Sequence, residues 1–368
     1  MNDSGILGSR RAIFAWLWLL IGMVFCMVVV GGVTRLTGSG LSIVEWAPIM
    51  GTLPPLNHAD WLAAFEQYKQ YPQYRITHPD MTLAQFQGIF FWEYVHRLLG
   101  RSIGMVFLLP LLWFWARGCV SVRLRWRLLL ALGLGALQGL MGWLMVKSGL
   151  VDEPRVSHFR LAAHLGLAFT IMAYLFWLVL QLRGDDGRTG ARAAAPRVLL
   201  WSVAALTVLQ IVYGAFVAGM RAGRVYNTFP KMNGRWIAEG VMGMDPAWLS
   251  LLEHDVTIQF VHRWLGTLLL ALVVTLWLRV RSGRFALVQR ASAAVLMGLV
   301  VLQYGLGVYT LLEQVPIVPA VMHQACASLV ALALVAAVWV LFRAGRGFGA
   351  LLRMGFGVAW VAFWTGSW

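Results

Sequence analysis

Four histidines of this chain, His96, His164, His262 and His323, stand inside long apolar segments. A lone histidine in such a place is most often a hydrogen-bonded packing residue. Here each one lies in the first third of an even-numbered segment, so all four are predicted to share one depth in a membrane. Two imidazoles on different helices of one bundle can coordinate one haem iron axially. The spacing therefore predicts two bis-histidine haem sites, His96–His164 and His262–His323.

An acidic residue stands beside only one of these histidines. Glu93 precedes His96 by three residues, so the two side chains share nearly one helix face. The matching position before His262 is the neutral Gln259. A carboxylate this near a membrane core is costly, which makes Glu93 a catalytic candidate. An ion pair with a nearby arginine is the alternative. The first pair is predicted to do chemistry and the second to carry electrons.

Arginines follow two of the histidines directly, as Arg97 and Arg263. Their side chains could extend to lipid headgroups, or their guanidinium groups could hold haem propionates, because the planar fork suits a carboxylate. Arg101 and Arg160 could assist in the first half. The second half has Thr267 and Pro319 at those positions.

The elements that must position these residues are membrane spans. The chain has 368 residues, 60% hydrophobic and 12% charged, with a mean hydropathy of +0.72. This composition excludes both a soluble globular domain and a disordered chain. Three scattered cysteines exclude a disulfide framework or a zinc site. Eight apolar segments are long enough to cross a bilayer as helices, and they are 13–33, 88–115, 128–147, 160–182, 197–219, 257–279, 291–311 and 318–342.

The net charge of +15 is interpreted as a topology signal. With a cytoplasmic N-terminus, the inner segments hold more than half of the 30 Lys and Arg residues and only three acids, Asp3, Asp185 and Asp186. The positive-inside rule therefore predicts that both termini are cytoplasmic. Anionic lipid is then the expected partner of the basic residues, and nucleic acid is excluded.

The two halves of the chain resemble each other. The segment 91–100 (FWEYVHRLLG) matches 257–266 (TIQFVHRWLG), and 135–144 (GALQGLMGWL) matches 300–309 (VVLQYGLGVY), each with a Gln before closely spaced glycines. Nearly constant offsets predict an all-α polytopic membrane protein whose eight helices form two parallel-repeat four-helix bundles. The predicted units are residues 1–190 with a large outer loop (34–87), residues 191–345, and a cytoplasmic or interfacial tail, 346–368.

With these motifs, the chain resembles the haem A synthase family, in its proteobacterial and mitochondrial branch. The most specific segments are 31–55 (GGVTRLTGSGLSIVEWAPIMGTLPP), 91–101 (FWEYVHRLLGR), 226–234 (YNTFPKMNG) and the surroundings of His323. Some bacterial members carry paired cysteines in outer loops. This chain has none there, so no disulfide step is expected.

The resemblance implies that haem O is converted to haem A by two hydroxylations of a ring methyl and dehydration to a formyl group. His96, His164 and Glu93 would serve substrate haem O, and His262 and His323 would ligate a resident haem b. Oxygen would come from water and electrons would pass to an unidentified acceptor. Glu93 would stabilise a cationic centre or deprotonate water, and the residues leave both roles open. Haem O synthase is the expected partner, and the bacterial inner membrane is the expected location. The oligomeric state is left open, and a homo-oligomer is possible.

Two other classes of protein also fit parts of the pattern. A di-haem b-type cytochrome that exchanges electrons with quinone needs paired histidines, but it would normally stack its haems across both leaflets. A transporter suits parallel repeats, but it would need polar residues at the midplane, where these segments are almost wholly apolar.

Overall fold

The computed structural model describes residues 3–44, 53–149, 156–183 and 196–343. Within these ranges, eight α-helices are long and apolar enough to cross a membrane, and no strand is formed. The helices are α1 (Asp3–Leu36), α3 (Leu83–Ala116), α4 (Val122–Gly149), α5 (His158–Arg183), α6 (Arg197–Met220), α8 (Asp255–Ser282), α9 (Leu287–Leu312) and α10 (Ile317–Arg343). Each coincides with a predicted span, which confirms the all-α multi-pass fold.

The second membrane-spanning helix, α3, shows how local sequence sets helix limits and packing. It starts five residues before its predicted span, because Thr82 and Gln85 form a reciprocal capping box at its N-terminus. Pro110 lies inside the helix and has no N–H to donate to the carbonyl of Val106. The indole Nε1 of Trp16 on α1 donates to that carbonyl instead, at 2.7 Å. The freed backbone group is therefore satisfied from a neighbouring helix, as a membrane interior requires.

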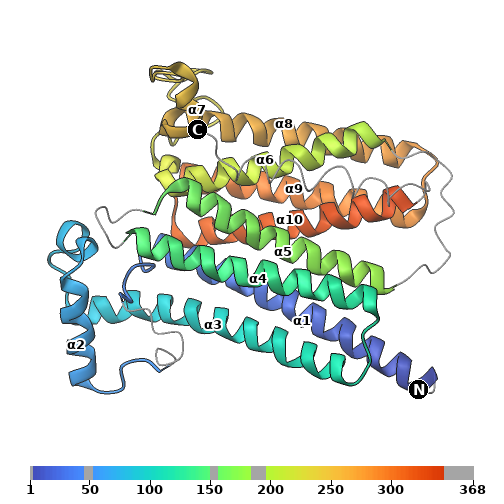
Figure 1. The fold of residues 1–368 in the computed structure, drawn as a ribbon. Helices are drawn as coiled ribbons and strands as arrows, with labels where there is room; N and C mark the ends of the chain where they lie inside the picture. The colour runs from blue at the N-terminus through green and yellow to red at the C-terminus, as the bar shows by residue number, and fades with distance from the viewer. Residues whose placement is uncertain (1–2, 45–52, 150–155, 184–195, 344–368) are drawn as a thin grey trace.

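The helices pack largely in chain order, as Figure 1 shows. In the first half, α1 packs against α3 and α5, and α4 packs against α5. In the second half, α6 packs against α8, and α9 contacts both α8 and α10. The halves meet through α5–α6, α1–α10 and α5–α10. The repeat relation and the units 1–190 and 191–345 stay predictions. Their boundary and the tail 346–368 lie outside the described residues.

The segments between α1 and α3 and between α6 and α8 carry short helices. The first holds α2 (His58–Lys69) and the π-helix η2 (Gln73–Thr77), and the second holds η3 (Ala222–Arg224), η4 (Ala247–Leu249) and α7 (Ser250–Glu253). In Figure 1, α2 and α7 lie at the same end of the molecule, opposite the N-terminus. The sequence had predicted only a long aromatic loop where α2 forms.

The helix α2 is held by aromatic packing on the outer end of α3. The rings of Phe65 and Tyr68 each lie 5.1 Å from the ring of Phe86, between centroids. Tyr68 and Phe86 are fully buried, and the Tyr68 hydroxyl hydrogen-bonds to Nδ1 of His78 at 2.9 Å. Burial and the charge of Arg221 lower the pKa of His78, so this ring is neutral at pH 7. This cluster fixes the segment between α1 and α3 against the N-terminal part of α3.

Candidate functional site

The four intramembrane histidines lie on four helices and form two pairs. His96 on α3 is near enough to His164 on α5 for charge on one ring to act on the other. His262 on α8 and His323 on α10 interact in the same way. The charge interaction thus runs within each predicted pair, one pair in each half. Their role as iron ligands stays a prediction.

Each histidine ring rests against a glycine on the preceding spanning helix. A Cβ placed on Gly31 would lie 3.4 Å from the ring of His96, and one on Gly142 would lie 3.3 Å from the ring of His164. In the second half, Gly214 faces His262 at 3.2 Å and Gly307 faces His323 at 2.8 Å, measured in the same way. A Cβ at Gly307 would force the His323 ring to shift, and one at Gly142 or Gly214 would need the ring to move by a few tenths of an ångström. At Gly31 a Cβ would be in ordinary contact with the ring. The glycines therefore let the rings lie close to the neighbouring helices, most tightly at His323.

The donor sets suit a haem better than a bare metal ion. No group of three or more His, Cys, Asp or Glu side chains that could hold a metal occurs in the described part of the chain. Two imidazoles alone under-coordinate a bare transition metal, whereas a porphyrin brings four nitrogens and needs only axial ligands. The Nδ1 atoms of His164 and His262 are buried and have no hydrogen-bond partner among the described residues. The residues thus fit axial ligation of haem in both halves.

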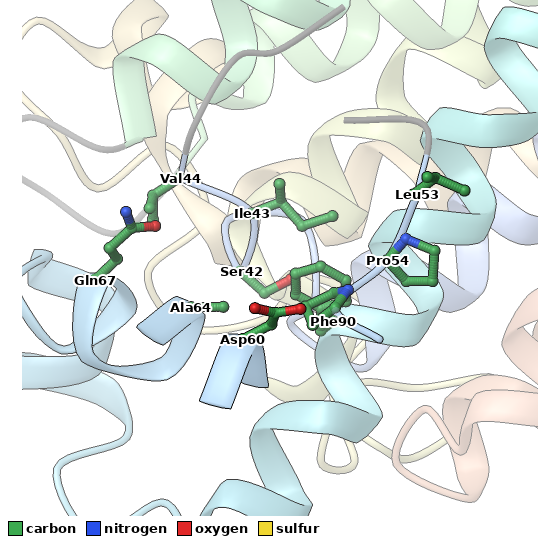
Figure 2. A pocket seen from close by; sticks show the side chains of 10 residues that line it. Ser42, Ile43, Val44, Leu53, Pro54, Asp60, Ala64, Gln67 and Phe90 are labelled. Carbon is green, nitrogen blue, oxygen red and sulfur yellow. The ribbon is translucent and has the colours of Figure 1, made fainter. Parts of the chain in front are cut away.

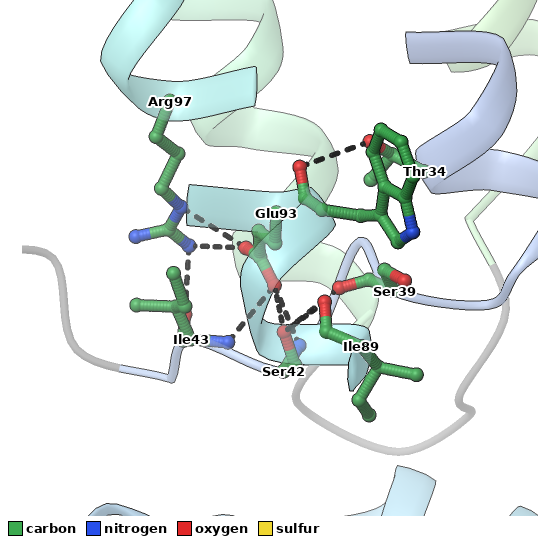
Figure 3. Close-up of polar contacts among 8 residues, drawn as sticks. Thr34, Ser39, Ser42, Ile43, Ile89, Glu93 and Arg97 are labelled. Carbon is green, nitrogen blue, oxygen red and sulfur yellow. Dashed lines mark hydrogen bonds and ion pairs between the residues drawn. The ribbon is translucent and has the colours of Figure 1, made fainter. Parts of the chain in front are cut away.

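Glu93 lies in a dense set of hydrogen bonds beside the first pair (Figure 3). Its Oε2 accepts from the backbone N–H and the hydroxyl of Ser42, both at 2.7 Å, and from the N–H of Ile43 at 2.9 Å. Its Oε1 accepts from Nε and Nη2 of Arg97 at 3.0 and 2.7 Å. The carboxylate is only 2% exposed. Five donors therefore hold the charge, and the ion pair considered as the alternative role for Glu93 is present.

This network attaches the chain after α1 to α3. Besides pairing with Glu93, Arg97 donates from Nη2 to the carbonyl of Ile43 at 2.7 Å. The hydroxyl of Ser42 also contacts the carbonyls of Ser39 and Ile89, at 3.0 and 3.4 Å. Sequence reasoning missed Ser42 and Ile43, because their link to Glu93 spans about fifty residues. The one available signal was their place in the GGVTRLTGSGLSI segment that carried the resemblance.

The matching positions of the second half also hold an outer segment, but without a negative charge. Gln259 is 2% exposed and donates to the carbonyl of Tyr226 at 3.0 Å. Arg263 donates to the carbonyls of Thr228 and Pro230. Among the described residues its buried Nη1 atom has no partner. Arg97 and Arg263 therefore both bind loop carbonyls, and only the first half adds a carboxylate to the arrangement.

The other two arginines predicted to meet propionates differ in exposure. Arg101 lies one turn after Arg97 on α3 and is partly buried, whereas Arg160 at the start of α5 is exposed. Neither is placed against Glu93 by a described hydrogen bond or ion pair. A propionate role for any of the four arginines stays a prediction.

A cavity of about 310 Å³ lies beside the Glu93 network (Figure 2). Ser42 and Ile43 form part of its wall, so their N–H groups face Glu93 while their other side borders the cavity. None of the four paired histidines lines it. The remaining lining residues are Val44, Leu53, Pro54, Pro55, Asp60, Ala64, Gln67 and Phe90.

Comparison with known proteins identifies one family over most of the chain. Residues 14–335 match the COX15-CtaA family, described as cytochrome oxidase assembly protein. A Heme A synthase of Rhodospirillum centenum is 47% identical over 317 residues, covering 86% of this chain and 84% of that protein. A Heme A synthase of Nitrosospira multiformis is 45% identical over 333 residues, covering 90% and 93%. One from a Bradyrhizobium species (strain BTAi1) is 48% identical over 323 residues, covering 87% and 88%.

Proposed function

Because this chain belongs to the COX15-CtaA family of cytochrome oxidase assembly proteins, we propose that it is a haem A synthase, an oxidoreductase that converts haem O to haem A. One ring methyl and one water become a formyl group, and four protons and four electrons are released. The electrons pass to an acceptor outside the chain, and the chain supplies the sites that bind the substrate and remove protons. The relatives named above support this function.

The proposal rests on a difference between two otherwise similar histidine sites, because only one of them has a carboxylate beside it. Both halves offer a pair of histidines resting on glycines. Only the first places a carboxylate, Glu93, one turn from a histidine. In our proposal His96 and His164 bind substrate haem O, and His262 and His323 hold a resident haem b, which supplies one-electron chemistry when bound.

Glu93 is the proposed catalytic carboxylate. Gln259 shows that a neutral side chain at this position is enough to hold an outer segment, so holding the segment does not by itself require a charge. Burying a carboxylate is costly even when it is paired. Retaining the charge at 2% exposure is therefore best explained by a role in stabilising positive charge that develops on the reacting methyl carbon, or in accepting a proton from water. Arg97 fixes the orientation of the carboxylate through its two donors.

The four arginines near the outer end are proposed to contact propionates. Arg263 has a buried Nη1 without a partner among the described residues, which supports this role at the second site. Arg97, Arg101 and Arg160 would act at the first site. The carboxylate of a propionate would accept two parallel hydrogen bonds from the planar guanidinium group of an arginine.

The proposed setting is the bacterial inner membrane, with both termini cytoplasmic and both histidine pairs toward the outer leaflet. The excess of Arg in the segments opposite α2 and α7 supports this orientation. A haem O synthase in the same membrane is the proposed source of substrate.

Haem analysis of cells that make haem O tests the function. Membranes with the wild-type chain should contain haem A, and the purified protein should contain haem b. His96→Ala should stop haem A formation and keep haem b, whereas His262→Ala should lose haem b or change its spin state, because a bis-imidazole iron loses one ligand. A wild-type chain that forms no haem A refutes the function. An unaltered low-spin spectrum in His262→Ala refutes the assignment of the second site.

A further inference from the structure

Arg35 lies where the two halves of the chain meet, one helical turn beyond the glycine that supports His96. It stands in the last turn of α1, four residues after Gly31, whose Cβ position is 3.4 Å from Nε2 of His96. Its Nη2 atom donates to the carbonyls of Ala218 and Gly219 in the last turn of α6, both at 2.9 Å. A side chain of the first half therefore caps a helix of the second half, at the end of the molecule that carries α2 and α7 (Figure 1).

The guanidinium group of Arg35 has donors left over after these two bonds. Its Nε atom is buried and has no hydrogen-bond partner among the described residues. Within the same part of the chain, no hydrogen bond uses its Nη1 atom. A buried N–H without a partner is costly, and more so on a charged group. The side chain therefore has unused capacity to bind an anion.

The charge around Arg35 is also unbalanced. Arg221, the C-cap residue of α6, is near enough for its charge to act on Arg35 and on His78. None of the four ion pairs found in the described ranges includes either arginine. The carbonyl end of α6 offsets part of the charge of Arg35, but a second cation nearby opposes it. An anionic ligand that contacts both guanidinium groups would offset this repulsion.

We propose, on the basis of the haem sites assigned above, that Arg35 binds a propionate carboxylate of the substrate haem and that Arg221 supports this contact through its charge. Haem O carries two propionates, and it is the anionic ligand that the proposed function brings to the His96 face of α1. Arg35 lies on this face, because residues four apart on a helix point the same way. A hydrogen bond from a guanidinium N–H to a carboxylate is among the stronger polar contacts in proteins. Arg35 is then a substrate-binding residue at the junction of the two halves, in addition to the arginines on α3 and α5.

The simplest rival explanation is that Arg35 only joins the two halves. Its Nη2 atom binds two carbonyls at the C-terminus of α6, where a cation is favourable. That role uses the charge and one nitrogen of the side chain, and it leaves the buried Nε without a function. The two explanations differ in one measurable respect. A purely structural arginine is indifferent to the charge of the haem propionates, whereas a propionate-binding arginine is not.

Esterification of the propionates separates the two explanations in the full-length protein. Purified chain that retains haem b is titrated with haem O and with the dimethyl ester of haem O, which keeps the ring, the iron and the tail but carries no propionate charge. The readout is the ratio of the two dissociation constants, followed by the low-spin absorption spectrum that two imidazole ligands give. The tested variant is Arg35→Gln. The matched control is Arg75→Gln, because Arg75 is exposed in η2 and its side chain makes only a 3.4 Å hydrogen bond to the carbonyl of Lys69 within the described residues.

The wild-type chain should bind haem O more tightly than the ester, and Arg35→Gln should reduce this preference about 10–100-fold, as expected for the loss of a hydrogen bond to a charged group. The affinity for the ester should stay near the wild-type value in Arg35→Gln, and Arg75→Gln should keep the full preference. If Arg35→Gln does not fold, Arg221→Gln leaves the bonds of Arg35 to α6 in place and should reduce the preference by a smaller factor. In that case an unchanged preference in Arg221→Gln overturns the inference.

The inference is also overturned by an unchanged preference in Arg35→Gln, or by an equal loss of affinity for haem O and for the ester, since either result leaves Arg35 as a link between the halves. Equal affinities of the wild-type chain for haem O and the ester overturn it as well. A wild-type chain that binds neither haem O nor its ester, or that forms no haem A, instead refutes the proposed function.

Discussion

Replacing Glu93 by glutamine decides whether the carboxylate acts in catalysis or only neutralises Arg97. The glutamine Oε1 can still accept from Ser42 and Ile43, which replaces the contacts of Oε2. Its NH2 group then faces the Arg97 guanidinium, which loses its negative partner. Glu93 is buried and Arg97 is partly buried, with side-chain exposures of 3% and 13%. Removing one member of such a pair typically costs about 3–5 kcal/mol.

The structural and the catalytic role of Glu93 predict different effects of Glu93→Gln on folded yield and on turnover. If Glu93 is only structural, Glu93→Gln should lower the yield of folded protein, and each folded molecule should form haem A at a near-normal rate. If Glu93 is catalytic, turnover per folded molecule should fall about 10²–10³-fold, because one positioned charge is lost from the developing cation. Haem O or the singly hydroxylated product should then accumulate. The assay is the ratio of haem A to haem O in membranes, normalised to haem b bound by the purified chain.

A double substitution sharpens the comparison. Glu93→Gln with Arg97→Gln removes both charges and leaves no unpaired buried arginine. A structural role predicts that this variant recovers folded yield relative to Glu93→Gln, with turnover per folded molecule near normal in both. A catalytic role predicts recovered yield with turnover still reduced, and Arg97→Gln alone measures the contribution of the arginine. A near wild-type haem ratio in Glu93→Gln, or its rescue in the double variant, would refute the catalytic assignment.

Three further outcomes follow from the packing and the charge distribution. Gly307→Ala should alter the haem b spectrum, because its Cβ would lie 2.8 Å from the His323 ring, whereas Gly298→Ala on the same helix meets no atom within 4 Å and should not. Trp16→Phe should destabilise the fold by about 1–3 kcal/mol, since the Val106 carbonyl loses its donor, and Pro110→Ala should recover part of this in a thermal unfolding assay. Reporter fusions after Gly187 and after Gly283 should both be cytoplasmic, and an outer signal at either one would contradict the topology.

The spans could be predicted from the sequence because a membrane helix needs little more than length and apolar composition. The pairing of histidines followed from their shared position in successive segments. The helix α2 could not be predicted in the same way, because its stability comes from aromatic rings on α3 rather than from its own weak periodicity. The contacts of Glu93 with Ser42 and Ile43 depend on how a segment about fifty residues away folds back onto α3. The residues next to Glu93 in the sequence do not indicate these contacts.

Three glutamines, Gln138, Gln210 and Gln303, contact three of the four paired histidines, and the sequence pattern indicated only part of this set. Gln138 and Gln303 stood out because their surroundings match at a nearly constant offset. Gln210 lies in the helix that has no glutamine in its counterpart, so the comparison of halves passed over it. A search for glutamine four residues before glycine in each helix that precedes a histidine helix would have found all three, because this spacing places both side chains on one face.

One difference between the two halves lies beside the matching histidines His96 and His262. Glu93 stands one turn before the first histidine and the neutral Gln259 stands one turn before the second. Both side chains are 2% exposed, so the first half retains a buried charge where the second half shows that a neutral group can hold an outer segment. A site that oxidises a methyl group benefits from a nearby anion, because positive charge develops on the reacting carbon. A site that only carries electrons does not need this anion, and a neutral pair of imidazoles avoids the cost of a buried charge.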